Sequence, residues 1–154
     1  MNTELKVSQS ELYETDYYLW IQNTLEKLKH QNYAQVDWEN LLDEIEDMAR
    51  NERRSLSSNL VIILLHLLKW QYQPEHRTGS WRSSMLEHRR RLEEALEDSP
   101  SLKRYLEEVL GRCYGNAVKQ AIAEAGLAIA TFPAECPYSI AEVLEAELSN
   151  LEFN

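Results

Sequence analysis

The chain has 154 residues, of which 44% are hydrophobic and 27% charged, and it carries 26 acidic against 16 basic residues. This composition is typical of a soluble globular protein and disfavours disorder, a collagen-like chain or a coiled coil alone. The acidic excess disfavours a general nucleic-acid coat and a binder of anionic membranes, because both surfaces repel negative charge.

Apolar residues recur at helical spacing through most of the chain, which predicts an all-α, single-domain bundle of about six helices. Residues 1–10 lack the pattern and are expected to form a flexible tail, and residues 11–154 a single helical domain. The first helix is predicted from about Tyr13 to Lys29. Asp37 is predicted to cap a second helix, whose sequence is strongly acidic.

The predicted third helix, from Leu56 to about Tyr72, is apolar on nearly every side, which places it at the centre of the bundle. No glycine or proline separates it from the second helix, so the two run almost directly into each other. A fourth helix is predicted over about 81–96, and a fifth has Pro100 at its first position. Ser139 is predicted to cap a short last helix.

The apolar stripe of the second helix is expected to face the core. It consists of Leu41, Leu42, Ile45, Met48 and Ala49, at i, i+3, i+4 and i+7 spacing.

The charge distribution and the cysteine content limit which partners and which cellular compartment are expected. Residues 1–50 hold 11 acidic and 4 basic residues, whereas residues 51–100 hold 7 acidic and 8 basic residues. The sequence is therefore still compatible with one anionic ligand bound at one local site. Cys113 and Cys136 lack the spacing of a metal site or a disulfide framework and indicate free thiols in a reducing cytoplasm. No signal peptide is expected, and the longest apolar run, 60–68, is far shorter than the roughly 20 residues of a membrane span.

One face of the third helix carries polar side chains among leucines. His66 and Lys69 lie on it together with Trp70 and Gln73, and a buried Lys or His needs a carboxylate or a hydrogen bond. The sequence therefore predicts an interior polar cluster. Its predicted members are Asp16, one or more of Glu44, Glu46 and Asp47, and His66 and Lys69.

Two interpretations of this cluster stay open. In the first, it is a pocket in which His66 is an acid–base group or a metal ligand, so His66, Lys69, Asp16 and Glu44 are the catalytic candidates. In the second, His66 is a core histidine with all its bonds made, next to an ion pair between helices.

Two weaker patterns point to phosphate chemistry. Glu44 and Asp47 form an ExxD pair like those that hold Mg²⁺ in all-α nucleotide pyrophosphatases, although Glu-rich helices produce such pairs by chance. No other cofactor is expected. Arg82 and His88 have the spacing of the RxxxxxH element of HEPN ribonucleases, which would act without metal.

Several segments, in the same order along nearly the whole chain, resemble the bacterial DUF29 family. They are YETDYYLW at 13–20, LLDEIEDM at 41–48, LLHLLKWQYQPEHRTGSWRSS at 64–84, EDSPSLKRYL at 97–106 and CPYSIAEVL at 136–144. The resemblance implies a single all-α domain without an established activity, and a cyanobacterial source. The most recognisable positions of the family pattern match Asp16, Glu44, Glu46, His66, Lys69, Gln73 and Trp81. His88 departs from the pattern, where Gln is more usual, and this weakens the ribonuclease interpretation.

The sequence therefore predicts a cytoplasmic helical module for binding or interaction, with a buried polar pocket. The alternative is an enzyme that acts on nucleotide or RNA phosphates. The ligand-binding candidates are Trp20, Glu46, Gln73 and Trp81, of which Trp81 would stack on a ligand if exposed. The expected partner is a protein or a small anionic ligand, a homodimer is open, and no membrane association is expected.

Overall fold

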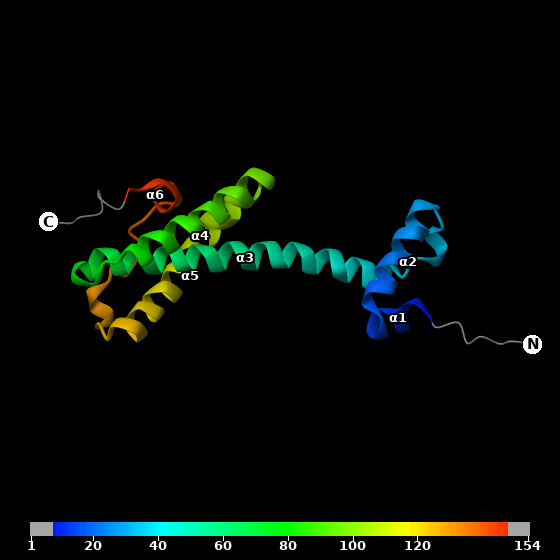
Figure 1. Ribbon diagram of the computed structural model, residues 1–154, viewed down its shortest axis with the longest axis horizontal. Coiled ribbons are helices and arrows are strands. Elements are labelled where there is room, and N and C mark those ends of the chain that lie inside the picture. Colours follow the sequence, from blue (N-terminus) through cyan, green and yellow to red (C-terminus); the bar gives the residue numbers. More distant parts are fainter. Residues whose placement is uncertain (1–7, 148–154) are drawn as a thin grey trace, which may run out of the picture. The chain divides into compact units, whose positions relative to one another are not determined.

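The computed structural model describes residues 8–147, and their regular elements are six α-helices and three short 3₁₀ helices (Figure 1). The α-helices are α1 (Gln9–Thr15), α2 (Tyr17–Lys29), α3 (Trp38–Tyr72), α4 (Gly79–Asp98), α5 (Leu102–Ala125) and α6 (Ile140–Glu145). The 3₁₀ helices are η1 (Tyr33–Gln35), η2 (Pro74–His76) and η3 (Ile129–Thr131). The predicted all-α class is confirmed. Residues 1–7 of the predicted tail lie outside the described residues, and α1 begins at Gln9, inside the predicted tail.

The chain divides into two compact units, Met1–Arg50 and Asn51–Asn154, where the sequence predicts one domain over 11–154. Helix α3 contributes residues to both units. It is one helix of 35 residues, because neither glycine nor proline interrupts it.

The predicted first helix is two helices, because Asp16 interrupts it. Its backbone leaves helical geometry (φ −146°, ψ 78°), and its side chain accepts a hydrogen bond from the backbone N of Leu19 at 3.1 Å. Asp16 is thus the N-cap of α2 and satisfies one of the free N–H groups of the first turn. The predicted cap of the next helix is confirmed, since Asp37 accepts from the backbone N of Asn40 at 3.4 Å.

We expect Asp16→Ala to lower the free energy of unfolding by about 1 kcal/mol, the usual cost of losing an N-cap side chain. Urea unfolding followed by circular dichroism measures the loss. Asp16→Asn keeps a capping oxygen and should restore most of the stability. Equal losses in the two variants would show that the cap is not the source of the effect.

The first unit buries few side chains. Among residues 8–50 these are Trp20, Thr24 and Val36. The Trp20 ring packs against Tyr13 and Tyr17, with centroids 4.9 and 6.0 Å away, and its Nε1 donates to Asp37 at 3.2 Å. Two helices and the start of a third therefore close around a single aromatic cluster.

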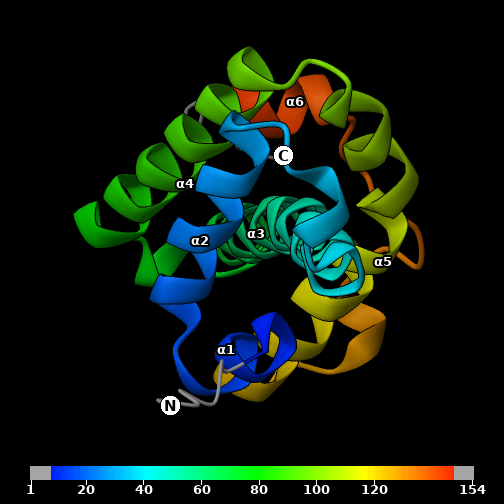
Figure 2. The same ribbon diagram turned by 90° about the vertical axis from the view of Figure 1, so that its right-hand side faces the viewer.

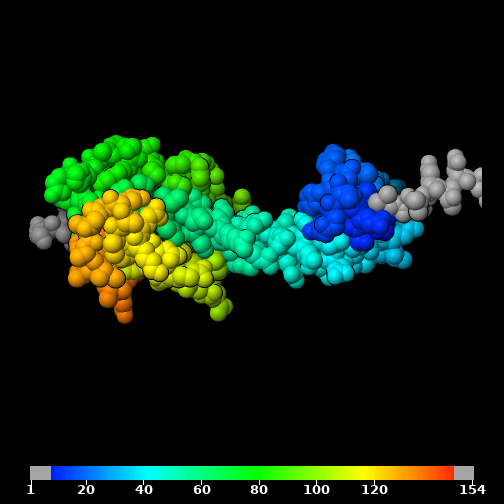
Figure 3. All heavy atoms as spheres, turned by 90° about the horizontal axis from the view of Figure 1, so that it is seen from below, coloured from blue at the N-terminus to red at the C-terminus, as the bar shows by residue number. Residues whose placement is uncertain are grey.

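The second unit holds the main hydrophobic core. The later part of α3 is its centre, as predicted for the helix near 56–72, with Leu60, Ile63, Leu64, Leu67 and Leu68 fully buried. Helices α4 and α5 run beside this part of α3, and the end-on view places α4, α5 and α6 around it (Figures 1 and 2). The atoms of α5, in yellow, pack against the green helices of the same unit (Figure 3).

The later helices begin close to the predicted positions, with one correction. Helix α4 begins at Gly79 with Thr78 as N-cap, and Ser139 caps α6 as predicted. Helix α5 begins at Leu102 rather than at Pro100. The reason is a tight turn before it, in which the backbone N atoms of Leu102 and Lys103 bond to the carbonyls of Ser99 and Pro100.

Of the helices that the structure describes, none has the length and apolar content needed to cross a bilayer.

Candidate functional site

Lys69 finds its carboxylate on a helix that the sequence did not suggest. Its Nζ lies 3.0 Å from Glu124 Oε2 on α5 and 4.5 Å from the centre of the Trp81 ring on α4. Burial raises the pKa of Glu124, but the hydrogen bonds from Lys69 and Gln120 outweigh it and hold this pKa below its ordinary value. The carboxylate is therefore charged at neutral pH, and Lys69 joins three helices of the second unit.

His66 lies one turn before Lys69 and is half-buried. Its Nδ1 is buried and has no hydrogen-bond partner among residues 8–147. Burial, followed by the charges of Lys69 and His88, lowers the pKa of His66. The imidazole is thus neutral at pH 7, so its contribution to the unit is that of a packed polar ring rather than of a cation.

We expect the second unit to lose stability in mild acid, and His66 to be one cause. Its folded pKa is lower than the ordinary value of 6.5. The unfolded chain therefore binds the proton more tightly, and the free energy of unfolding falls as the pH drops below that value. His66→Leu should flatten the decline, measured by urea unfolding at several pH values between neutral and mildly acidic.

The exposed His76→Gln serves as the matched control for this experiment and should keep the wild-type profile. A decline in His66→Leu as steep as in the wild type would contradict the assignment.

A hydrogen bond between α3 and α4 was missed by the sequence analysis. His88 Nδ1 lies 2.7 Å from Asn59 Oδ1, and Asn59 Nδ2 donates to the carbonyl of Ser55. Burial lowers the pKa of His88, and Arg91 adds to the effect. The signal was present, because Asn59 lies two helical turns before His66 on the same face of α3.

The carboxylates that the sequence assigned to the polar cluster have partners in the first unit. Asp16 caps α2, Glu44 accepts from Tyr13 and Tyr17, and Asp47 pairs with Arg50. Glu46 is exposed. The structure thus brings His66 and Lys69 together with Glu124. The described partners of the predicted carboxylates are tyrosine, arginine and backbone donors of the first unit itself.

The ligand-binding candidates are distributed over different environments. Trp20 is buried in the aromatic cluster of the first unit. Gln73 precedes η2, and its backbone N bonds to the carbonyl of Lys69 at 2.9 Å. Trp81 packs against the core of the second unit and carries Lys69 over its ring. The Trp81 ring is therefore engaged within the fold and does not form an open stacking platform.

The groups proposed for phosphate chemistry are engaged in internal contacts. The Arg82 guanidinium lies 5.4 Å from the centre of the Trp70 ring, and His88 Nδ1 faces Asn59. Among the described residues, no group of three or more His, Cys, Asp or Glu side chains is arranged to hold a metal ion.

The basic segment around α4 is largely neutralised by its own helix. Arg90 and Arg91 lie 2.8 and 3.0 Å from Glu87, and Arg90 also pairs with Glu94. These pairs hold the pKa of Glu87 at about 2, well below its ordinary value. Glu87 and Glu94 therefore offset part of the local excess of arginine.

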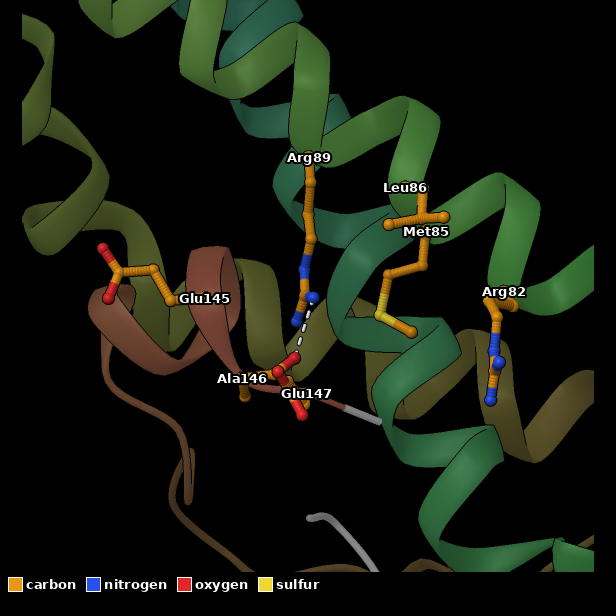
Figure 4. Close-up of a pocket in the computed structure, with 7 residues that line it drawn as sticks. All are labelled: Arg82, Met85, Leu86, Arg89, Glu145, Ala146 and Glu147. Atoms are coloured by element: carbon orange, nitrogen blue, oxygen red, sulfur yellow. Dashed lines mark hydrogen bonds between the residues drawn. The ribbon is translucent and has the colours of Figure 1, made fainter. Parts of the chain in front are cut away.

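Arg89, in the same helix, is only 9% exposed and supports α6 (Figure 4). Its Nε donates to the carbonyl of Val143 and its Nη1 to that of Ala146, both at 2.8 Å. A cavity of about 320 Å³ lies beside it. Two arginines and two glutamates are among its lining residues, namely Arg82, Arg89, Glu145 and Glu147. Because these charges offset each other, the cavity has no net preference for an anion.

The largest departure from the sequence analysis is on the first unit. The stripe of the predicted second helix was expected to face the core, yet Leu42, Ile45 and Met48 are 55%, 54% and 66% exposed. In the described residues of this unit, α1, α2 and η1 contact the start of α3 but leave these three side chains of the stripe exposed.

The exposed stripe borders a groove between α2 and α3, which we call the N-terminal groove. It has a volume of about 290 Å³, and all of its lining residues lie within 17–48. The exposed aliphatic side chains of the lining are Ile21, Leu25, Ile45 and Met48, and Glu44 is the charged residue among the lining. The groove therefore offers an apolar surface that α1 and η1 leave open.

The described residues form an all-helical protein with an exposed apolar groove on its first unit. The chain belongs to the family described as Domain of unknown function DUF29, whose family model matches residues 12–149. The resemblance seen in the sequence is thereby confirmed. Comparison with curated proteins and with solved structures gave no match.

Proposed function

We propose that this protein is a protein-binding module, and that the N-terminal groove holds one apolar face of a helix from a partner protein. The observation that carries the proposal is the exposure of Ile21, Leu25, Ile45 and Met48 around one groove. Single exposed apolar residues are ordinary, whereas a contiguous set of them marks an interaction surface.

The size of the first unit supports a missing partner. Among residues 8–50, just three side chains are buried, and units this small seldom supply a sufficient core by themselves. Full burial of one Ile, Leu or Met side chain contributes about 1.5–3 kcal/mol. Covering the groove would therefore stabilise the unit as well as the complex.

A helix fits this groove better than a flat surface does. The lining comes from two neighbouring helices, α2 and α3, and side chains at i, i+3, i+4 and i+7 of a third helix can insert between them. Met48 suits such a site because its flexible thioether adapts to different partners.

The test uses a fluorescein-labelled peptide with leucines at helical spacing and glutamines elsewhere, followed by anisotropy. We expect saturable binding to the wild type and loss of binding in Ile45→Asp, because the carboxylate would be desolvated in the groove. Ile129→Asp is the matched control, since Ile129 is 73% exposed and lies in the second unit. Absence of binding to the wild type, or equal loss in both variants, would refute the proposal.

We further propose the cytoplasm as the compartment. Cys113 and Cys136 are both free thiols, as is usual where the environment is reducing. Fractionation of cells that express a tagged chain tests this, and recovery outside the cytoplasm would contradict it.

A further inference from the structure

We infer that the partner helix is basic as well as apolar, and that one of its Lys or Arg side chains pairs with Glu44 in the N-terminal groove. This inference rests on the proposed function and adds the chemistry of the partner. It starts from the position of Glu44, a charged side chain among apolar lining residues.

Glu44 is fixed in place by two tyrosines. The hydroxyl groups of Tyr13 and Tyr17 each donate to one of its carboxylate oxygens at 2.5 Å. These hydrogen bonds lower the pKa of Glu44, so that the carboxylate is ionised at neutral pH. Each carboxylate oxygen has a second lone pair, so the group can still accept from a further donor.

No basic residue that the structure describes balances this charge. Both hydrogen bonds to Glu44 come from neutral hydroxyl groups, and no cation is among the causes of its pKa shift. A carboxylate in an apolar groove loses hydration when the groove is covered, and it then needs a cation or a donor to compensate. A neutral helix would not compensate the desolvation of Glu44, whereas a helix with a Lys or Arg at the matching position would compensate it.

The wider charge of the unit acts in the same direction. Residues 1–50 hold 11 acidic and 4 basic residues. A second copy of this unit or an anionic membrane would bring negative charge towards negative charge. A cationic helix is attracted over a distance of about 8–10 Å at ordinary ionic strength, which favours it over both alternatives.

The test compares two labelled peptides with identical leucine stripes, one with lysines and one with glutamines on the flanking positions. We expect the lysine peptide to bind the wild type about fivefold more tightly than it binds Glu44→Gln, as for one partly exposed ion pair. The glutamine peptide gains nothing from Glu44 and should bind Glu44→Gln at least as tightly as it binds the wild type. Glu46→Gln, an exposed site on the same helix, is the matched control and should keep wild-type affinity for both peptides.

Two further measurements protect the test against a folding defect. Glu44→Asp keeps the charge and should keep the preference for lysine. Added salt should weaken binding of the lysine peptide to the wild type and leave the glutamine peptide unchanged.

The outcomes separate the two proposals. If Ile45→Asp abolishes binding of both peptides while Glu44→Gln discriminates neither, the groove binds helices and the inference about charge is overturned. If neither peptide binds the wild type, the proposed function fails and the inference falls with it. A dimer that neither peptide displaces, detected by sedimentation, would assign the groove to a second copy and overturn both.

Discussion

Leu64→Ala is expected to lower the free energy of unfolding by about 2–5 kcal/mol, because it removes most of a fully buried side chain from a packed core. Leu64 lies in the part of α3 that the second unit surrounds, so neighbouring helices cannot easily collapse into the space. Chemical unfolding followed by far-UV circular dichroism measures the change.

The matched control is Leu86→Ala on α4, which removes the same atoms from a side chain that is 59% exposed. We expect that loss to be within about 0.5 kcal/mol. Equal effects of the two variants would contradict the assignment of α3 as the centre of the core.

Arg89→Met is expected to cost about 2–4 kcal/mol and to loosen α6. The substitution keeps a long apolar stem but removes the donors to the carbonyls of Val143 and Ala146. Hydrogen bonds from a charged group are worth about 1.5–3 kcal/mol each, so two of them give about 3–6 kcal/mol. Removing the buried guanidinium also removes the cost of its desolvation, which offsets part of this loss. Cations at the end of a helix also favour its dipole, so α6 loses a capping charge.

Amide hydrogen exchange locates this effect. Exchange should accelerate in α6 and much less in α3. Arg90→Met is the control, because Arg90 is an exposed residue of the same helix whose partners are Glu87 and Glu94. A loss in Arg90→Met as large as in Arg89→Met would show that helix propensity or overall charge, rather than the support of α6, causes the change.

The helical class and the central helix were predictable because they depend on local spacing. The run from Leu56 to Tyr72 is apolar on nearly every side, and the centre of a helical unit is where such a segment is buried. Asp37 and Ser139 were predicted as caps for the same reason, since a cap acts on N–H groups within three residues. Asp16 was assigned to the core instead, because the apolar spacing on either side of it continues and hides the break.

The partners of the polar residues were not predictable, because they depend on which helices meet. The sequence offered several carboxylates for Lys69, and the actual partner, Glu124, lies 55 residues further along the chain. Arg89 belongs to the arginine-rich part of the chain, yet it lies between Met85 and Leu92 at i, i+4 and i+7, on the buried stripe of α4. The position of a charged residue on an apolar stripe was the sequence signal that Arg89 is buried and bonded within the fold.

The exposed stripe of α3 shows a second limit of prediction from the sequence. Leu42, Ile45 and Met48 have the spacing of a core-facing helix, and the sequence cannot say whether the surface that covers them belongs to the same chain. An amphipathic helix that binds a partner protein and one that packs within its own unit have the same spacing of apolar residues. The structure adds that the described residues of the first unit leave these side chains exposed.

Mapping of the bound peptide by NMR tests the central claim most directly. The lysine peptide is titrated into protein with labelled methyl groups on its isoleucines, leucines and methionines. The account predicts shifts at Ile21, Leu25, Ile45 and Met48, and none at Ile129, the exposed isoleucine of the second unit. Shifts at Ile129, or unmoved signals from the N-terminal groove while the peptide binds, would contradict it.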